Sequence, residues 1–152
     1  TLTDEKILKI ATRSSGVVVR VLLGRELAAI RPARLEGYTR HPVVNFVFPG
    51  MIPCVGKSVE GCIYTNVSPL ERNLLDWFEG DEYIRQTVQA TVMDDSEEMT
   101  VEAYVWKPHL VDQLLQNQEW PYENFLQQHS EWYLKNTVQP CRDEMERLGM
   151  TK

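Results

Sequence analysis

The chain of 152 residues has no long apolar run and no basic stripe, the two features that would tie it to a membrane or to nucleic acid. No stretch approaches the roughly eighteen consecutive apolar residues that a membrane-spanning helix requires. Acidic side chains outnumber basic ones, 22 against 16, which gives a formal net charge of -6. A surface that binds nucleic acid normally carries the opposite balance. We therefore expect neither a membrane nor a nucleic acid as a partner.

Cysteine and histidine are also scarce and scattered. The cysteines are odd in number and show no Cys-x-x-Cys spacing: Cys54, Cys62 and Cys141. The histidines are equally dispersed: His41, His109 and His129. A lone histidine is more often a surface or capping residue than a ligand or a base. We therefore expect no disulfide framework and no metal site, and this cysteine usage suits a reducing, cytoplasmic location.

What the chain does have is the length and apolar content of one folded domain, which we place over residues 1–152. Hydrophobic residues make up 43% of the sequence, enough for a substantial core at this size. We find no internal repeat, linker or low-complexity segment that would divide it.

The clearest local signal is a short amphipathic helix that follows Ser68. Ser68 is a favoured N-cap, Pro69 suits the first helical position, and Glu71 completes a capping box three residues after the cap. Gly80 is typical of the residue just beyond a helix C-terminus. Apolar residues recur at helical spacing and give the helix one face that must pack on a core: Leu70, Leu74, Leu75 and Phe78.

Glu79 lies in the last turn of this helix, with Asp76, Asp81 and Glu82 close by in the sequence. The helix dipole is negative at this end, so a carboxylate there costs up to about 1 kcal/mol. An acidic helix end is most often a solvated turn. Local rules are also broken where chemistry requires it, so the residues alone leave both interpretations of Glu79 open.

The segments before this helix are expected to alternate between helical and extended structure. Thr3 can cap a helix over residues 3–10. The apolar run over residues 17–23 suits either a helix or a strand, and we favour a helix. Residues 27–38, 43–48 and 59–65 have the composition of strands, with a loop over residues 51–58.

Beyond Gly80, residues 83–93 and 100–106 alternate in polarity like two half-buried strands, joined by an acidic hairpin turn over residues 94–98. Four or five strands joined mostly by short turns predict a small, mostly antiparallel, barrel-like sheet. From about residue 109 to residue 150 the apolar spacing becomes helical. We therefore expect an α+β fold, with flanking helices and a C-terminal helical extension.

The helix and the segment after it resemble the signature of a known superfamily. Residues 76–85 read Asp-Trp-Phe-Glu-Gly-Asp-Glu-Tyr-Ile-Arg. This run is similar to the Asp-x-Phe-Glu and Tyr-x-Arg signature of the gamma-glutamylcyclotransferase-like superfamily, above all in its avirulence-induced-gene-like branch of plants and fungi. Further matches follow in the family's order: Leu23-Gly24-Arg25, residues 32–40, Pro53, Gly56 and residues 59–64. Together the matches cover residues 1–104, about two thirds of the chain.

The resemblance implies a gamma-glutamylcyclotransferase-like fold and an acyl-transferring reaction. In the family, the free α-amine of a γ-glutamyl group attacks its own γ-carbonyl, which yields 5-oxoproline and releases an amine. The resemblance places Glu79 at the position of the family's proton-carrying glutamate, and neighbouring carboxylates would favour a proton on it. Since the reaction is intramolecular, it requires neither a metal nor a cofactor. The implied partner is a small γ-glutamyl compound.

The family's substrate-binding loop reads Tyr-Gly-Ser/Thr-Leu and connects a first strand to a helix. Thr1 and Leu2 resemble its last two residues, with Thr3 and Asp4 just beyond. The resemblance therefore makes the segment Thr1, Leu2, Thr3 and Asp4 the candidate substrate-binding loop, through its backbone N–H groups. It also implies that the N-terminal strand is missing from this sequence, and that a native protein has roughly ten or more residues before Thr1.

Two alternatives stay open. The same fold could bind a small γ-glutamyl-like or carboxylate ligand without turnover, in stress or defence signalling. The aromatic residues of the C-terminal helices could instead serve a protein-interaction module, although such a stripe more often packs on a core. For the enzyme that the resemblance implies, we expect Asp76, Tyr83 and Arg85 to hold the helix and the following strand in register rather than to touch substrate.

Overall fold

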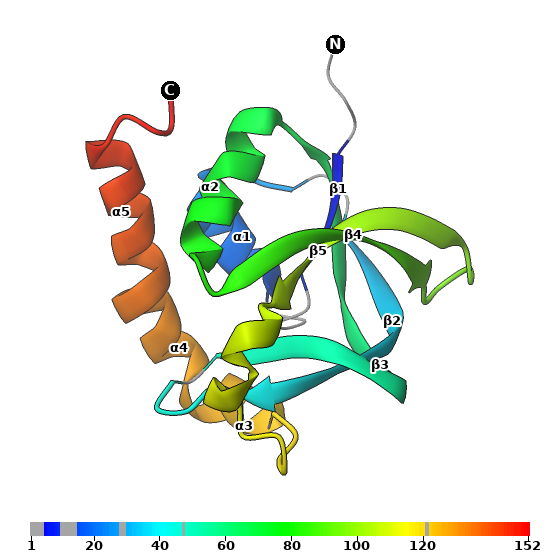
Figure 1. Ribbon diagram of the computed structural model, residues 1–152. Coiled ribbons are helices and arrows are strands. Elements are labelled where there is room, and N and C mark those ends of the chain that lie inside the picture. The colour runs from blue at the N-terminus through cyan, green and yellow to red at the C-terminus, as the bar shows by residue number, and fades with distance from the viewer. Residues whose placement is uncertain (1–4, 10–14, 28–29, 47, 121) are drawn as a thin grey trace.

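The computed structural model describes residues 5–9, 15–27, 30–46, 48–120 and 122–152, and within these it places five β-strands in one sheet (Figure 1). The strand order is β1-β3-β2-β4-β5, and β1 also pairs with β5, so the sheet closes into a barrel. The pairings are antiparallel except that of β1 with β5. The strands are β1 (Glu5–Lys9), β2 (Ile30–Pro42), β3 (Pro49–Val67), β4 (Tyr83–Val92) and β5 (Glu98–Trp106). The expected α+β fold with a mostly antiparallel, barrel-like sheet is confirmed.

The first strand, β1, is formed by residues for which we expected a helix. It lies between β3 and β5 in the barrel. The helix expected over residues 3–10 is therefore wrong, whereas a further strand before Thr1 stays a prediction. Without β1, the facing edges of β3 and β5 would leave backbone N–H and C=O groups unpaired. Pairing those groups outweighs a weak local preference for helix.

The longest pairing joins β2 and β3 into one hairpin. The register ends with Pro42 opposite Pro49, so the chain reverses between them. The separate strand expected over residues 43–48 is therefore wrong. Asn45 has a φ of 67°, a left-handed conformation that asparagine tolerates better than most residues and that suits a reversal of the chain.

β3 also runs through residues 51–58, where we expected a loop. A register shift between Glu36 and Tyr38 leaves residues 54–57 of β3 bulged opposite a single residue of β2. Gly56, with a φ of 83°, lies within this bulge. The proline and glycine that suggested a loop are residues that a bulge accommodates, so the strand continues on both sides of it.

Helices flank the barrel on one side and follow the last strand. α1 spans Ser15–Leu23, which confirms the helix favoured for the apolar run, and α2 spans Pro69–Glu79 between β3 and β4. After β5 come the 3₁₀ turn η1 (Pro108–Gln113), α3 (Tyr122–Gln128), α4 (Ser130–Tyr133), the π-helical turn η2 (Leu134–Val138) and α5 (Gln139–Arg147). Figure 1 shows α5 on the outer side of α1 and α2, away from the barrel. Of the helices in the described ranges, none is both long and apolar enough to cross a bilayer.

Two apolar clusters hold these layers together. One includes, among the side chains that the structure describes, residues of β2, β3, β4 and β5, and it contains Ile63, which has no exposed surface. The other lies where α1, α2 and α5 meet β3 and β5, and contains Leu22, Leu74 and Met145. Because successive strand residues point to opposite faces, Ile63 belongs to the first cluster and Tyr64 to the second. The second cluster fixes α2 on the outside of the sheet.

Candidate active site

α2 begins with the reciprocal pair of hydrogen bonds that its sequence predicts. The Ser68 hydroxyl accepts a hydrogen bond from the Glu71 N–H at 3.1 Å, and the Glu71 carboxylate accepts one from the Ser68 N–H at 3.0 Å. Pro69 occupies the start of the helix, where its missing N–H needs no partner. The capping box is therefore confirmed, and it fixes the point at which the chain leaves β3.

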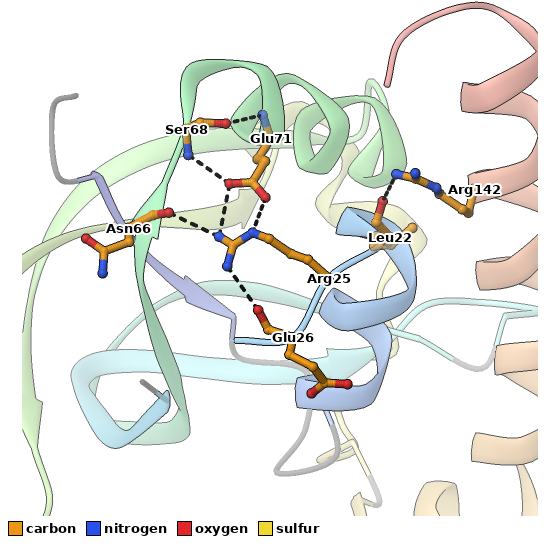
Figure 2. Close-up of polar contacts among 7 residues, drawn as sticks. All are labelled: Leu22, Arg25, Glu26, Asn66, Ser68, Glu71 and Arg142. Carbon is orange, nitrogen blue, oxygen red and sulfur yellow. Dashed lines mark hydrogen bonds and ion pairs between the residues drawn. The ribbon is translucent and has the colours of Figure 1, made fainter. Parts of the chain in front are cut away.

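Arg25 adds a long-range clamp to this capping box, as Figure 2 shows. Its guanidinium pairs with both carboxylate oxygens of Glu71 and donates to the Asn66 carbonyl at 3.1 Å. Partial burial acts to raise the pKa of Glu71, but the hydrogen bonds from Arg25 and Ser68 outweigh it and hold that pKa below its usual value. The hydrogen bond to Glu71 in turn raises the pKa of Arg25. The segment after α1 is thereby tied to the start of α2.

The end of α1 is held from a second side by α5. Gly24 has a φ of 68°, and its N–H donates to the Arg20 carbonyl at 2.8 Å. Arg142 of α5 donates to the Leu22 carbonyl at 3.0 Å (Figure 2), and a Cβ on Gly24 would lie 2.8 Å from the guanidinium of Arg142. The Leu-Gly-Arg motif therefore brings α1, α2 and α5 together.

The other end of α2 carries Glu79, its last residue. Gly80 follows with a φ of 82° and a ψ of -167°, a conformation essentially reserved for glycine. The Gly80 N–H donates to the Asp76 carbonyl at 3.1 Å and closes the last turn. Glu79 is half-buried and comes four residues after the fully buried Leu75. Since residues four apart share a helix face, Glu79 emerges on the side of α2 that faces the protein.

Asp76, one turn before Glu79, is held by side chains from two strands. The Tyr104 hydroxyl of β5 donates to one carboxylate oxygen of Asp76 at 2.7 Å, and Arg85 of β4 donates to the other. Arg85 also forms an ion pair with Glu102 of β5, with 3.0 Å between Nε and the carboxylate. Partial burial lowers the pKa of Arg85, but its contacts with Asp76 and Glu102 outweigh this and raise that pKa.

Aromatic side chains surround the same end of α2. The ring of Tyr83 packs edge-on against Trp106 with centroids 5.1 Å apart, and its hydroxyl donates to the Pro49 carbonyl at 2.7 Å. Phe78 packs edge-on against Tyr133 of α4, with centroids 6.4 Å apart. Burial raises the pKa of Tyr83 well above its usual value, so its hydroxyl stays a donor. The ion pair of Asp76 with Arg85 agrees with the expectation that these two residues hold the helix against the strands, whereas these contacts of Tyr83 lie within the sheet.

The family described as gamma-glutamyl cyclotransferase, AIG2-like, matches residues 12–134. The chain belongs to this AIG2-like family. Protein AIG2 C of Arabidopsis thaliana is 34% identical over 118 residues, which are 78% of this chain and 70% of that protein. AIG2-like protein D of the same plant is 31% identical over 138 residues, 90% of this chain and 89% of its own length.

Solved structures place the AIG2-like chain in the same fold. A solution structure of an Arabidopsis thaliana protein matches with a TM-score of 0.67 at 27% identity, over 97% of this chain and 87% of that one. A structure named gamma-glutamyl cyclotransferase matches with a TM-score of 0.54 at 15% identity, over 69% of this chain and 68% of that one. The second likeness concerns the fold alone. The resemblance stated from the sequence motifs is confirmed at the level of family and fold.

The candidate site residues of this AIG2-like chain fall into two groups. Glu79 is within the matched range and is placed by α2, whereas Thr1, Leu2, Thr3 and Asp4 lie outside the described residues and before the matched range. In the chain these four residues precede β1. The approach of the N-terminal loop to Glu79 therefore stays a prediction. Across the described ranges, no three His, Cys, Asp or Glu side chains gather in a way that could hold a metal ion.

Sequence reasoning missed the partners that hold α2 at its two ends. Arg25 lies 46 residues from Glu71, and Tyr104 lies 28 residues from Asp76. A signal for the second contact was present in the strands, because Arg85 is directly opposite Tyr104 in the β4–β5 register. Alternation places directly opposite residues on one face of the sheet, so the expected hairpin already brought these two side chains together.

Proposed function

We propose that this protein is a γ-glutamylcyclotransferase acting on a small γ-glutamyl compound. The α-amine nitrogen of the substrate forms a bond to its own γ-carbonyl carbon, and the bond from that carbon to the leaving amine breaks. The products are 5-oxoproline and the released amine or amino acid. The observation that carries the proposal is the family match over residues 12–134, which includes Glu79 and the anchored end of α2.

Glu79 is the proposed proton carrier. As the ring closes, the attacking nitrogen must lose a proton and the leaving nitrogen must gain one, so one carboxylate can serve both steps in turn. The family match supports this choice, since Glu79 lies within the matched range at the position that resembles the family's glutamate. Glu71 and Asp76 are each engaged by an arginine and by a hydrogen-bond donor that anchors the helix, which gives both of them structural roles.

The backbone N–H groups of Thr1, Leu2, Thr3 and Asp4 are the proposed donors to the substrate. Successive backbone N–H groups of a loop can bind a carboxylate and can stabilise the oxyanion that develops on the γ-carbonyl. Because nucleophile and electrophile belong to one molecule, the protein has only to hold the substrate and move one proton. The proposed reaction thus requires no metal and no cofactor.

The test is the release of 5-oxoproline from a panel of γ-glutamyl amines and γ-glutamyl amino acids. Glu79→Gln keeps the shape of the side chain but cannot accept the proton, so turnover should fall at least about a hundredfold. Binding of 5-oxoproline should survive in this variant, because backbone donors rather than the carboxylate would hold it.

Glu82→Gln is the matched control. Glu82 is an exposed carboxylate three residues further along, and its replacement should leave turnover near the wild-type rate. Full activity of the purified Glu79→Gln protein would show that Glu79 is not the proton carrier. A wild-type protein that binds 5-oxoproline yet releases none from any member of the panel would favour the non-catalytic, ligand-binding alternative.

A further inference from the structure

We propose that Tyr104 is a positioning residue for the γ-glutamylcyclotransferase reaction: by donating to Asp76, it fixes the turn of α2 that carries Glu79. This inference rests on the proposed function. In this role Tyr104 acts through the helix rather than on the substrate.

Asp76 is the point at which two strands grip the last turns of α2. Its two carboxylate oxygens have different partners, Tyr104 of β5 at 2.7 Å and Arg85 of β4. Arg85 is itself shared with Glu102, which lies two residues before Tyr104 on β5. A carboxylate held through both oxygens has a fixed orientation, so the helix cannot turn about its axis without breaking these bonds.

The backbone of the same residue closes the turn around Glu79. The Asp76 carbonyl accepts the hydrogen bond from the Gly80 N–H at 3.1 Å. Glu79 therefore lies within the turn that the Asp76 carbonyl closes. The carboxylate of the same Asp76 ties this turn to the sheet. A shift of Asp76 would be passed on to Glu79 within a single helical turn.

Tyr104 is suited to a lasting donor role. Its side chain is buried among residues of α1, α2 and β3, and its exposed fraction is 8%. Burial, and then the hydrogen bond to Asp76, raise the pKa of Tyr104 well above its usual value, so the phenol keeps its proton. The ring fills the cluster and the hydroxyl orients the carboxylate, and a single substitution can separate these two roles.

The experiment compares Tyr104→Phe with Tyr38→Phe. Both variants lose one hydroxyl and keep the ring, but the Tyr38 hydroxyl accepts a hydrogen bond from Gln86 of β4 at 3.0 Å instead of donating one to α2. A displacement of about 1 Å at a reacting group can cost roughly a hundredfold in rate. We therefore expect kcat to fall between about tenfold and a hundredfold in Tyr104→Phe, with KM changed less than about threefold. Tyr38→Phe should keep kcat within about twofold of the wild type.

A second comparison separates positioning from general loss of packing. If Tyr104 acts through Asp76, the double variant Asp76→Asn with Tyr104→Phe should lose clearly less kcat than the product of the two single losses. Thermal melting of each variant shows the folded fraction, and kcat is expressed per folded molecule. A strictly multiplicative loss would overturn the coupling between the two residues.

The remaining outcomes each decide one point. Wild-type kcat with a lower Tm in Tyr104→Phe would make Tyr104 structural only and overturn the inference. A raised KM at unchanged kcat would place Tyr104 on the substrate and overturn it as well. If the wild type releases no 5-oxoproline from any γ-glutamyl compound, the proposed function fails and the positioning role fails with it. If the wild type turns over and Tyr104→Phe matches it, only the positioning role fails.

Discussion

The two ends of α2 differ in how their sequences suit a helix terminus. At the first end, Ser68, Pro69 and Glu71 each occupy a position that a helix N-terminus favours, and Arg25 reinforces them from the segment after α1. At the other end, Asp76 and Glu79 are carboxylates beside the negative pole of the dipole. The contacts at the second end come from β4 and β5, so the sheet rather than the helix holds it in place.

This difference separates the part of the helix that supports stability from the part that is proposed to carry chemistry. Local preferences suffice at the N-terminal end, because capping and charge favour the same conformation. At the C-terminal end they conflict, and tertiary contacts override them. Residues that keep an unfavourable local arrangement need such support from the surrounding fold, and they concentrate at functional sites. Variants at the two ends should therefore affect different measurements.

Among the variants that test this comparison, the largest effect on stability is expected for Gly80→Ala. The φ of 82° and ψ of -167° suit glycine alone, and an added Cβ would meet the Glu82 carboxylate at 2.9 Å. The free energy of unfolding should fall by about 1–3 kcal/mol, which lowers Tm by roughly 3–10 °C. Because the backbone beside Glu79 must shift, turnover per folded molecule should fall as well.

Gly56→Ala is the control for this prediction. Gly56 has a φ of 83° in the bulge of β3, and nothing lies within 4 Å of an added Cβ. It should lose stability through backbone strain but keep wild-type turnover per folded molecule. Equal loss of turnover in both variants would mean that the rate follows stability alone, and the comparison between the ends of α2 would fail.

Glu71→Gln tests the opposite end of the helix. The amide keeps an acceptor for the Ser68 N–H but loses the ion pair with Arg25. Loss of a hydrogen-bonded charge partner at a part-buried site should cost about 1–2 kcal/mol and lower Tm by several degrees. Turnover per folded molecule should stay at the wild-type level. Glu144→Gln, which removes an exposed carboxylate paired with Arg147, should change Tm little.

The difference in stability between the wild type and Glu71→Gln should change with pH in a definite direction. The pKa of Glu71 is lowered in the folded protein below its ordinary value of 4.5. Its contribution to stability is therefore fully present above about pH 4.5 and is lost as the pH falls through the lower, folded pKa. The gap in Tm between the wild type and Glu71→Gln should narrow from pH 6 towards pH 3, by roughly the several degrees that separate the two at neutral pH. A gap that widens on acidification would contradict the ion pair with Arg25.

The sequence allowed α2 and the β4–β5 hairpin to be predicted, since both depend on patterns within about a dozen residues. Ser68 and Gly80 marked the ends of the helix, and the alternation after Tyr83 marked the strands. β1 and the full length of β3 were not predictable in this way. Their pairing depends on partners far along the chain, and such partners override local preference.

The same distinction applies to the candidate site. Glu79 could be proposed from a motif, because a motif is a local pattern. The clamps on α2 could not, since Arg25 and Tyr104 reach it across 46 and 28 residues of chain. A sequence therefore indicates which carboxylates break a local rule. Only the folded chain shows that Asp76 is engaged by the sheet, and this contact gives Asp76 a structural role that differs from the role proposed for Glu79.

The smallest effect is expected at the hairpin tip between β4 and β5, from the exchange of Asp95-Ser96 for Asn-Gly. Ser96 has a φ of 58°, which glycine adopts without strain, so that half of the exchange favours the folded turn. Asp95 accepts from the Glu97 N–H at 2.9 Å, and asparagine can keep this bond. The loss is the contact at 2.7 Å from Arg31, an exposed ion pair of the kind that contributes little. The gain and the loss should nearly cancel and leave Tm within about 2 °C of the wild type, with unchanged turnover. The single variants Asp95→Asn and Ser96→Gly should shift Tm slightly in opposite directions. A drop of Tm by more than about 5 °C in the double variant would show that the tip contributes to the stability of the barrel.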